Sequence, residues 1–511
     1  MKNKKIALVL IGILSLANIL SGCGSKSVSN NKVDDTNKKI TIMAPVLFPN
    51  IPYNDNDIEK KLEELTGYDV DIIWVPDSSY ADKVSITLAS NNVPNIMILK
   101  EKDAATISNV KKGAFWKLDD YLKDYDNLSK ADKNIKLNAS FNGETYGIYR
   151  KRDVVRSAVI FRKDWLDKLE LKVPTTLAEF TNVLEKFKND DPDGNGINDT
   201  TGMVIPKWPG TLNSNSPFDQ MVVWFGAPNG TAIKDGKVVP DFMTDEYMKS
   251  LDYFKGLYDK GLINKDFAVL NSGKWDDPFV NGKAGVIVDT QTRAMNRLAK
   301  EMITKYGDDG KFGDSYVTMV GNITTDAGDY ILPTTGYSGI MAIPKQSVKD
   351  EKKLRKVLDF INKANSEEAT TLLNHGVEGT HYEMKAGKIQ DTKDQKLLNE
   401  KQTYAQLSCD EPGFDIEALS VKNGSQLEAI KTQINENGEK KSVFNPCASL
   451  ISDVYSKKGA QLQNIMSDAR IQYIAGQIDK DGYKAAQKQW LDTGGQEYID
   501  DLTKTYNEKL K

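Results

Sequence analysis

The chain has 511 residues, of which 39% are hydrophobic and 27% are charged. This suits a soluble globular protein long enough for two or more domains of ordinary size. The formal net charge of −4 at pH 7 implies no basic face, which argues against nucleic acid as a partner.

The N-terminus has the pattern of an export signal. Three lysines lie within the first five residues and precede an apolar run over residues 6–17, which is too short to cross a hydrocarbon layer of about 30 Å. Leu20-Ser21-Gly22-Cys23 follows and resembles a bacterial lipobox; the alternative is an ordinary secretory signal with an incidental cysteine. We expect residues 1–22 to be removed. Cys23 would then carry acyl chains such as palmitate that anchor the protein on the outer face of the cell membrane.

Residues 23–39 are rich in Ser, Asn, Lys, Asp and Thr and contain almost no apolar residues. This composition predicts a flexible tether between the lipid and the first domain. Only Cys409 and Cys447 remain beyond Cys23. Two cysteines in an exported chain can form one disulfide, and the sequence leaves the bonded and the free states open.

Regular elements begin after the tether and alternate in type. Short apolar runs are separated by segments whose apolar residues recur every three or four positions. Ile58, Leu62 and Leu65 share one helical face, and Gly67 stands where that helix should end. Strands alternating with short helices predict a parallel sheet built of βαβ units. The expected strands are 40–44, 70–75 and 95–99, and the expected helices are 57–66 and 80–89.

Three later segments are predicted to carry the chain from one domain to the other. Each is charged or rich in glycine, lacks periodicity and precedes a predicted strand. These crossovers are 150–156 before a strand at 158–161, 282–285 before a strand at 286–289, and 336–339 before a strand at 340–343. A helix is expected over 245–260, and the last third of the chain has helical periodicity over 352–362, 367–374, 460–469 and 479–490.

The clearest local signal lies between Arg162 and Met203. Thr176 and Glu179 fit an S/T-x-x-E capping box, in which each side chain satisfies a free backbone N–H at a helix start. Four apolar residues then recur at helical spacing and should share one buried face. They are Leu177, Phe180, Leu184 and Phe187.

An acidic loop punctuated by glycine follows this helix. Side chains that carry oxygen occur at alternate positions, and Gly196 stands at the sixth, which matches the first half of a calcium loop. The twelfth position of an EF-hand would be Glu, and here it is Gly202. The alternative is a solvated turn that binds nothing. If the loop binds calcium, its role should be structural, because a closed loop leaves no open coordination position for chemistry. The oxygen-bearing residues are Asp191, Asp193, Asn195 and Asp199.

These features together resemble a known family. The motifs are the lipobox, RKDWLDKL, VPTTLAEF, DPDGNG, GYSGIMAIPK and LLNHGVEGTHY, and they extend over nearly all of the mature chain. They resemble the family 1 extracellular solute-binding lipoproteins of Gram-positive bacteria, which serve ABC sugar transporters, and are similar to the calcium-binding alginate-oligosaccharide receptors. The resemblance implies an α/β fold of the two-lobed periplasmic-binding-protein type (type II), with hinge crossovers and a ligand cleft between the lobes.

The resemblance and the three crossovers imply a division of the chain. The N-terminal lobe would combine residues 40–150 with 290–336, and the C-terminal lobe would combine 157–287 with 340–511, including the calcium loop 191–199. Carried over from the alginate receptors, the calcium ligands would be Asp191, Asp193, Asn195, the carbonyl of Ile197, and Asp199. Thr200 stands where some members of the family have an acidic residue.

Sugar binding requires flat apolar faces and planar polar groups. Four aromatic residues lie in irregular or crossover segments where a cleft would form, although each could instead be a packing residue. Arg150, Arg152 and Arg156 could meet an acidic sugar or could form a solvated, charged crossover. The four candidate ligand contacts are Tyr146, Trp208, Trp275 and Tyr337.

Enzyme signatures are weak. The histidines His375 and His381 form no H-E-x-x-H motif, and no G-x-S-x-G elbow or P-loop is present. A pair of carboxylates acting as in glycosidases stays open, since acidic residues are numerous. We therefore expect a monomeric, non-enzymatic binding subunit that passes an oligosaccharide to ABC permease subunits. The alternatives are a surface glycosidase or lyase, and a sensory or adhesive lipoprotein.

Overall fold

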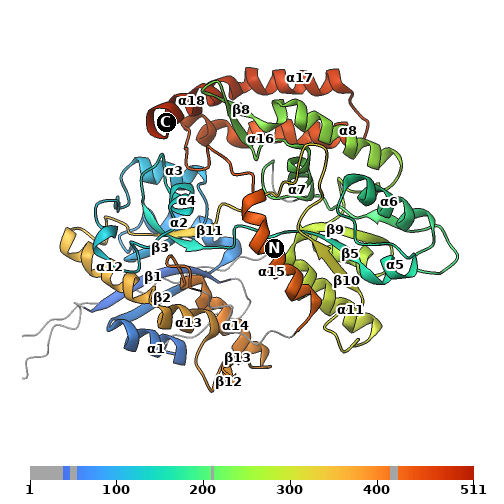
Figure 1. The fold of residues 1–511 in the computed structure, drawn as a ribbon. Helices are drawn as coiled ribbons and strands as arrows, with labels where there is room; N and C mark the ends of the chain where they lie inside the picture. Colours follow the sequence, from blue (N-terminus) through green and yellow to red (C-terminus); the bar gives the residue numbers. More distant parts are fainter. Residues whose placement is uncertain (1–37, 47–54, 209–211, 415–423) are drawn as a thin grey trace, which may run out of the picture.

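The protein consists of two α/β lobes that stand side by side (Figure 1). The computed structural model describes residues 38–46, 55–208, 212–414 and 424–511. One lobe is built on a five-stranded sheet of order β2-β1-β3-β11-β4, and the other on a four-stranded sheet of order β10-β5-β9-β6. This architecture confirms the predicted fold class. The predicted signal peptide, Cys23 and nearly all of the tether lie outside the described residues. No helix in the described ranges is both long and apolar enough to cross a membrane.

The first sheet combines a parallel core with two antiparallel strands. β1 pairs in parallel with β2 along eight residues, from Lys39 opposite Asp69 to Val46 opposite Pro76. β3 is also parallel to β1, whereas β11 runs antiparallel to both β3 and β4. The observed elements match the strands and helices predicted for residues 40–99. They are β1 (Lys39–Val46), α1 (Asp57–Thr66), β2 (Asp69–Pro76), α2 (Tyr80–Leu88) and β3 (Ile96–Leu99). The two remaining strands of the sheet are β4 (Gly147–Lys151) and β11 (Tyr337–Ala342).

Helices cover this first sheet on both faces, which explains its apolar strands. Parallel strands that are buried on both sides read as continuous hydrophobic runs. All four residues of β3 are buried, and the same core includes residues from helix α12 and from the segment that ends at Cys409. The helices of this lobe are α3 (Ala104–Lys111), α4 (Lys133–Ala139), α12 (Glu351–Ala364), α13 (Glu367–His375) and α14 (Gln395–Tyr404), with a hairpin of β12 (Tyr382–Lys385) and β13 (Lys388–Asp391).

The second lobe is organised around β5 (Ser157–Arg162), which pairs antiparallel with β9 (Ala284–Thr290) and β10 (Val317–Val320). Helix α6 (Leu177–Asn189) packs on this sheet and leads to β6 (Thr201–Met203). Its predicted capping box is confirmed, because Thr176 and Glu179 each bond the backbone of the other. Phe180, Leu184 and Phe187 are fully buried, as their spacing predicted.

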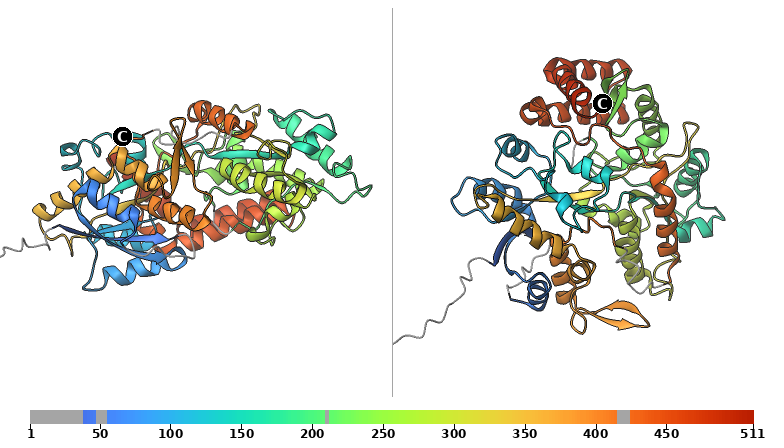
Figure 2. Two further views of the ribbon diagram at one scale, coloured as in Figure 1. Left: turned by 90° about the horizontal axis from the view of Figure 1, so that it is seen from below. Right: turned by 60° about the vertical axis from the view of Figure 1, so that its left-hand side comes forward.

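The remaining elements of the second lobe are mainly helical. The C-terminal helices α16–α18 gather at one end of the molecule beside α8, and the β12–β13 hairpin projects at the other end (Figure 2). The elements are α5 (Lys163–Lys168), α7 (Pro217–Val222), β7 (Thr231–Lys234), β8 (Lys237–Pro240), α8 (Asp245–Asp259), α9 (Asp276–Val280), α10 (Gln291–Arg293), α11 (Ala299–Tyr306), α15 (Gln426–Gly438), α16 (Asp453–Ile474), α17 (Lys480–Trp490) and α18 (Gln496–Lys509).

The strand pairing corrects the predicted crossovers and lobe boundaries. β4 lies in the first sheet and β5 in the second, so 150–156 is a crossover, and the step from β10 to β11 is another. The turn at 282–285 is not a crossover, because α9 and β9 belong to the same lobe. Losing this crossing reverses the two assignments that follow it: 290–336 lies largely in the second lobe, and 340–414 lies in the first. The chain is back in the second lobe at α15.

The two cysteines beyond the tether are both free and buried. Cys409 belongs to the core of the first lobe, whereas Cys447 packs against Leu502 of α18 in a separate cluster. The possibility of a disulfide is therefore not realised in this structure.

Candidate ligand junction and metal loop

The two crossovers run side by side and are hydrogen-bonded to one another. The N–H of Arg152 donates to the carbonyl of Gly336 at 2.9 Å, and the N–H of Thr334 donates to the carbonyl of Val154 at 2.8 Å. The hydroxyl of Thr334 also donates to the carbonyl of Asp153 at 2.7 Å. These two crossovers thus form a short two-stranded connection between the lobes, and a relative movement of the lobes would bend it.

A third connection is made by residues 442–453, which lead from α15 to α16. The backbone N–H of Asn142 donates to the carbonyl of Ser449 at 2.8 Å. The side-chain oxygen of Asn142 accepts the N–H of Ile451 at 2.9 Å. The ammonium of Lys102 donates to the carbonyls of Ala448, Asn138 and Ser140 at distances from 2.5 to 3.0 Å. Burial lowers the pKa of Lys102 to about 7. This segment therefore fastens the second lobe to the turn between α4 and β4.

Hollows lie on both lobes near the crossovers. On the first lobe, a cavity of about 170 Å³ opens at the carboxyl end of β3, where ligands bind in many open α/β sheets. Its lining includes Tyr80, Lys100 and Glu101. On the second lobe, a groove of about 390 Å³ separates the crossover residues Gly321–Ile331 from helix α15.

The predicted tryptophan contacts lie together on the second lobe. The rings of Trp208 and Trp275 meet edge to face with their centroids 6.0 Å apart. Trp275 is 1% exposed, its Nε1 donates to the carbonyl of Val204, and the guanidinium of Arg293 lies 4.2 Å from its ring. The prediction of Trp275 as a direct sugar contact is wrong for this conformation, because its surroundings bury it. Trp208 is half-buried, and its Nε1 donates to Ser214.

The predicted tyrosines lie on the first lobe and are both half-buried. Tyr337 begins β11, where burial and the nearby charge of Glu101 raise its pKa to about 12. Tyr146 precedes β4, packs edge to face on Phe141 and donates its hydroxyl to Glu144 at 2.9 Å. Both rings border the same small hydrophobic cluster. The structure thus divides the candidate contacts into one pair on each lobe.

The three arginines of the crossover 150–156 differ in how deeply they are buried and in whether they are hydrogen-bonded. Arg150 is 7% exposed, and its guanidinium donates to the carbonyl of Ser338 and to the side chain of Gln406, both at 2.8 Å. Burial lowers its pKa. Arg152 is exposed and Arg156 is half-buried.

The polar side chains next to these aromatic residues and arginines come from separate segments of the chain. They were not identified from the sequence. Arg293 pairs with Asp276 and Asp289 at 2.5 Å beside the two tryptophans. We call β4, β11, the two crossovers and residues 442–453 together the junction. Glu101, Lys102 and Gln406 likewise reach it from loops or helix ends. No local motif marks any of these residues.

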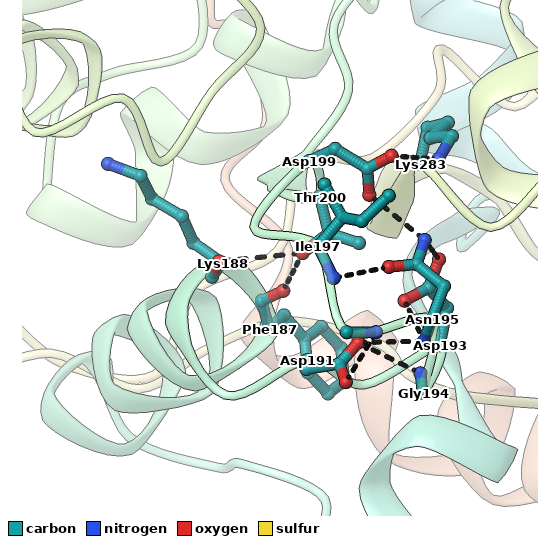
Figure 3. A network of polar contacts seen from close by, with 11 residues as sticks. Phe187, Lys188, Asp191, Asp193, Gly194, Asn195, Ile197, Asp199, Thr200 and Lys283 are labelled. Atoms are coloured by element: carbon teal, nitrogen blue, oxygen red, sulfur yellow. Dashed lines mark hydrogen bonds and ion pairs between the residues drawn. The ribbon is translucent and has the colours of Figure 1, made fainter.

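The acidic loop between α6 and β6 forms a closed polar network (Figure 3). The carboxylate of Asp191 accepts the N–H groups of Gly194, Asn195 and Gly196 at 3.0 to 3.1 Å. These backbone bonds lower its pKa although desolvation opposes them. Gly194 and Gly196 both have φ near +75°, a conformation that side chains rarely adopt, and this allows the tight reversal.

The other carboxylates of the loop face nitrogen donors. The amide nitrogen of Asn195 lies 2.7 Å from Asp193 Oδ2 and 3.3 Å from Asp199 Oδ1. The ammonium of Lys283, on the turn before β9, pairs with the second oxygen of Asp199. This pair and the Asn195 amide lower the pKa of Asp199. Asn195 therefore draws Asp193 and Asp199 toward one point.

Thr200 and Gly202, which follow the loop, are committed to packing and do not face this point. The hydroxyl of Thr200 donates to the carbonyl of Phe187 at 2.7 Å, so it caps the end of α6. A Cβ at Gly202 would lie 2.8 Å from the carbonyl oxygen of Leu184, so the twelfth position is reserved for glycine by the packing of β6 on α6. In the part of the chain that the structure describes, no three His, Cys, Asp or Glu side chains are gathered as a metal cluster.

Residues 55–371 match the family model for bacterial extracellular solute-binding proteins. The chain belongs to this family. Lipoprotein LipO of Bacillus subtilis (strain 168) is 46% identical to it over 99% of this chain and 98% of LipO. The polygalacturonan/rhamnogalacturonan-binding protein YtcQ of the same strain is 31% identical, over 99% of this chain and all of YtcQ. The resemblance found in the sequence motifs is thereby confirmed.

Solved structures of solute-binding proteins share the fold. A human-milk-oligosaccharide-binding protein of Bifidobacterium longum infantis ATCC 15697 has a TM-score of 0.68 at 19% identity, covering 92% of this chain and 98% of that one. The calcium-free alginate-binding protein AlgQ2 has a TM-score of 0.65 at 18% identity, with coverage of 92% and 98%. An EF-hand mutant of the Streptococcus pneumoniae protein FusA with fructo-nystose has a TM-score of 0.63 at 20% identity, with coverage of 92% and 99%.

Proposed function

We propose that this solute-binding protein captures an oligosaccharide between its two lobes and delivers it to the permease of an ABC importer. The observation that carries the proposal is the two-lobed fold joined by paired crossovers, in a chain that matches LipO over nearly its whole length. The names of several relatives and structural neighbours specify glycans as ligands. Acylation of Cys23 would keep the protein at the outer membrane face, next to the permease.

Ligand contacts would come from both lobes. Trp208 on the second lobe and Tyr337 and Tyr146 on the first lobe retain exposed ring surface, which suits the C–H-rich faces of sugars. Trp275 would support Trp208 from behind. We infer that closure about the crossovers brings the two sides onto one ligand, and that binding takes place without turnover.

We also propose that the acidic loop holds a structural calcium ion. The fit of the loop is favourable: three carboxylates and one amide lie on nine consecutive residues, and Asn195 joins two of these carboxylates. Asp191, Asp193, Asn195, Asp199 and the carbonyl of Ile197 would hold the ion. Because Thr200 and Gly202 are committed to packing, water would complete the coordination. The EF-hand named for FusA occurs in a protein of the same fold.

Calorimetric titration of the mature protein with a panel of plant, fungal and bacterial oligosaccharides tests the function. The proposal predicts one-to-one binding of at least one glycan and recovery of that glycan intact after prolonged incubation. Cleavage of the glycan would show an enzyme instead. Binding of a non-sugar solute, with no response to any glycan, would contradict the oligosaccharide assignment.

A further inference from the structure

Two arginines at the junction are set apart from the other arginines of the chain by their lack of partners. The chain has eight arginines, and the structure describes all of them. Six form side-chain hydrogen bonds or ion pairs, such as Arg470 with Asp219 at 2.5 Å and Arg355 with Asp124 at 3.0 Å. Arg152 and Arg156 have no such side-chain bond to any described residue.

These two guanidinium groups lie on one short crossover, between the end of β4 and the start of β5. The backbone N–H of Arg152 is bonded to Gly336, and the carbonyl of Arg156 accepts the N–H of Gln291 at 2.9 Å. The backbone beneath both side chains is therefore fixed to both lobes, while the side chains themselves are uncommitted. The two arginines are four positions apart on this crossover, and burial together with the charge of Arg156 lowers the pKa of Arg152.

Nearby acidic groups do not neutralise the two cations. Asp153 lies between them in the sequence, but it is exposed and contributes only a long-range attraction to Arg152. Asp410 pairs with Lys151 at 3.4 Å. Glu411 is buried and accepts the N–H of Tyr149, and desolvation raises its pKa to about 8, which disfavours its charged form. The crossover thus carries uncompensated positive charge where the lobes meet.

An unpaired cation pair is costly to maintain unless an anion joins it, and guanidinium groups bind carboxylates through paired, charge-assisted hydrogen bonds. We infer that Arg152 and Arg156 recognise a carboxylate of the captured glycan, so that the ligand class is an oligosaccharide containing uronic acid. The inference rests on the proposed function, which it deepens. Arg150 holds the strand in place through Ser338 and Gln406 and is not expected to reach the ligand.

The experiment compares acidic glycans with their uncharged methyl esters by calorimetry. The probes are oligogalacturonate and oligoalginate, each as the free acid and as the methyl ester, alongside a panel of neutral oligosaccharides. The wild-type protein should bind one of the acids at least about tenfold more tightly than its ester, and this preference should shrink as salt rises.

The variant R152Q/R156Q should lose that preference and bind acid and ester alike. Its melting temperature should be equal to or slightly above that of the wild type, because neither side chain makes an internal bond and the repulsion between the two charges is removed. The matched control is K352Q, which removes an exposed charge on α12 without touching the junction. Equal binding of acid and ester by the wild type, or binding of neutral glycans alone, would overturn the inference and leave the proposed function standing. Failure of every glycan would overturn both.

Discussion

The metal loop and the ligand junction are built in opposite ways. The loop takes its oxygen groups from nine consecutive residues between α6 and β6, and Lys168 and Lys283 contact it from outside. The junction is assembled from β4, β11, the two crossovers and residues 442–453, which are widely separated in the chain. A site made of consecutive residues can be recognised in a sequence, whereas a site assembled by the fold requires the strand order first.

The loop is also insulated from the junction. It lies on the side of the second lobe away from the first lobe, beyond α5 and α6 (Figure 1). We therefore expect changes in the loop to leave sugar affinity unaltered, and changes in the junction to alter sugar affinity more than calcium affinity. The following predictions test this contrast, from the largest effect to the smallest.

The substitution Gly202→Glu would supply the twelfth-position carboxylate of an EF-hand. A Cβ there meets the Leu184 carbonyl oxygen at 2.8 Å and the Leu184 Cβ at 2.9 Å, so the variant should lose about 3 kcal/mol of unfolding free energy. Urea unfolding measures this loss. The matched control is Ile197→Glu, since Ile197 is 59% exposed and its side chain packs against little. A G202E variant as stable as I197E would show that β6 can separate from α6.

Calcium removal should lower the melting temperature, and calcium should restore it. A ligand at 100 times its dissociation constant stabilises the folded state by about 2.7 kcal/mol. Asp193→Ala removes a carboxylate that faces Asn195 and should make the protein indifferent to chelator. Differential scanning calorimetry with and without chelator makes the measurement, and Asp190→Ala, at the end of α6 just before the loop, is the control. An unchanged wild-type transition would refute the metal loop.

Thr334→Val removes a hydroxyl that makes two hydrogen bonds at the paired crossovers. The hydroxyl donates to the carbonyl of Asp153 at 2.7 Å and accepts the N–H of Gly336 at 3.1 Å, so the change should cost about 2 kcal/mol of unfolding free energy. Its effect on glycan binding should exceed its effect on calcium binding, as titrations of both ligands would show. The matched control is Thr304→Val, whose hydroxyl bonds the carbonyl of Lys300 within α11. Equal effects of the two variants on glycan binding would remove the special role of the crossover.

Lys283→Gln tests the smallest effect. The ammonium of Lys283 neutralises Asp199 in this structure, so calcium has to displace it. The variant should bind calcium more tightly than the wild type, with little change in unfolding free energy without the ion, because the pair is exposed. Calcium titration of the two proteins measures the difference, with Lys186→Gln as a control on the outer face of α6. A weaker affinity in K283Q would show that the lysine positions Asp199 for the metal.

Much of the fold was predictable from local patterns. The helix start at Thr176 and Glu179 and the alternation of strands and helices up to Leu99 matched the structure because capping and periodicity are local properties. The lobe boundaries were not predictable in the same way. A glycine turn at 282–285 looks like the turn at 336–339, and only strand pairing shows that one stays within its lobe while the other leaves it.

The candidate sites show the same difference between features that are local in the sequence and features that depend on the fold. Hydrogen bonds within the loop link Asn195 to Asp191 and Asp199, and the assignment of these residues to calcium stays a prediction. Trp275 was assigned to the ligand because its segment is irregular, but Trp208 and Arg293 enclose it in three dimensions. The partnerless state of Arg152 and Arg156 could not be read from the chain either, because it depends on which acidic groups the fold brings near.

A crystal structure of the protein with a bound oligosaccharide tests the central claim most directly. We predict a glycan enclosed between the lobes, in contact with residues of the first lobe, the second lobe and the crossover 152–156. A glycan bound to one lobe alone, with the crossovers untouched, would contradict the account.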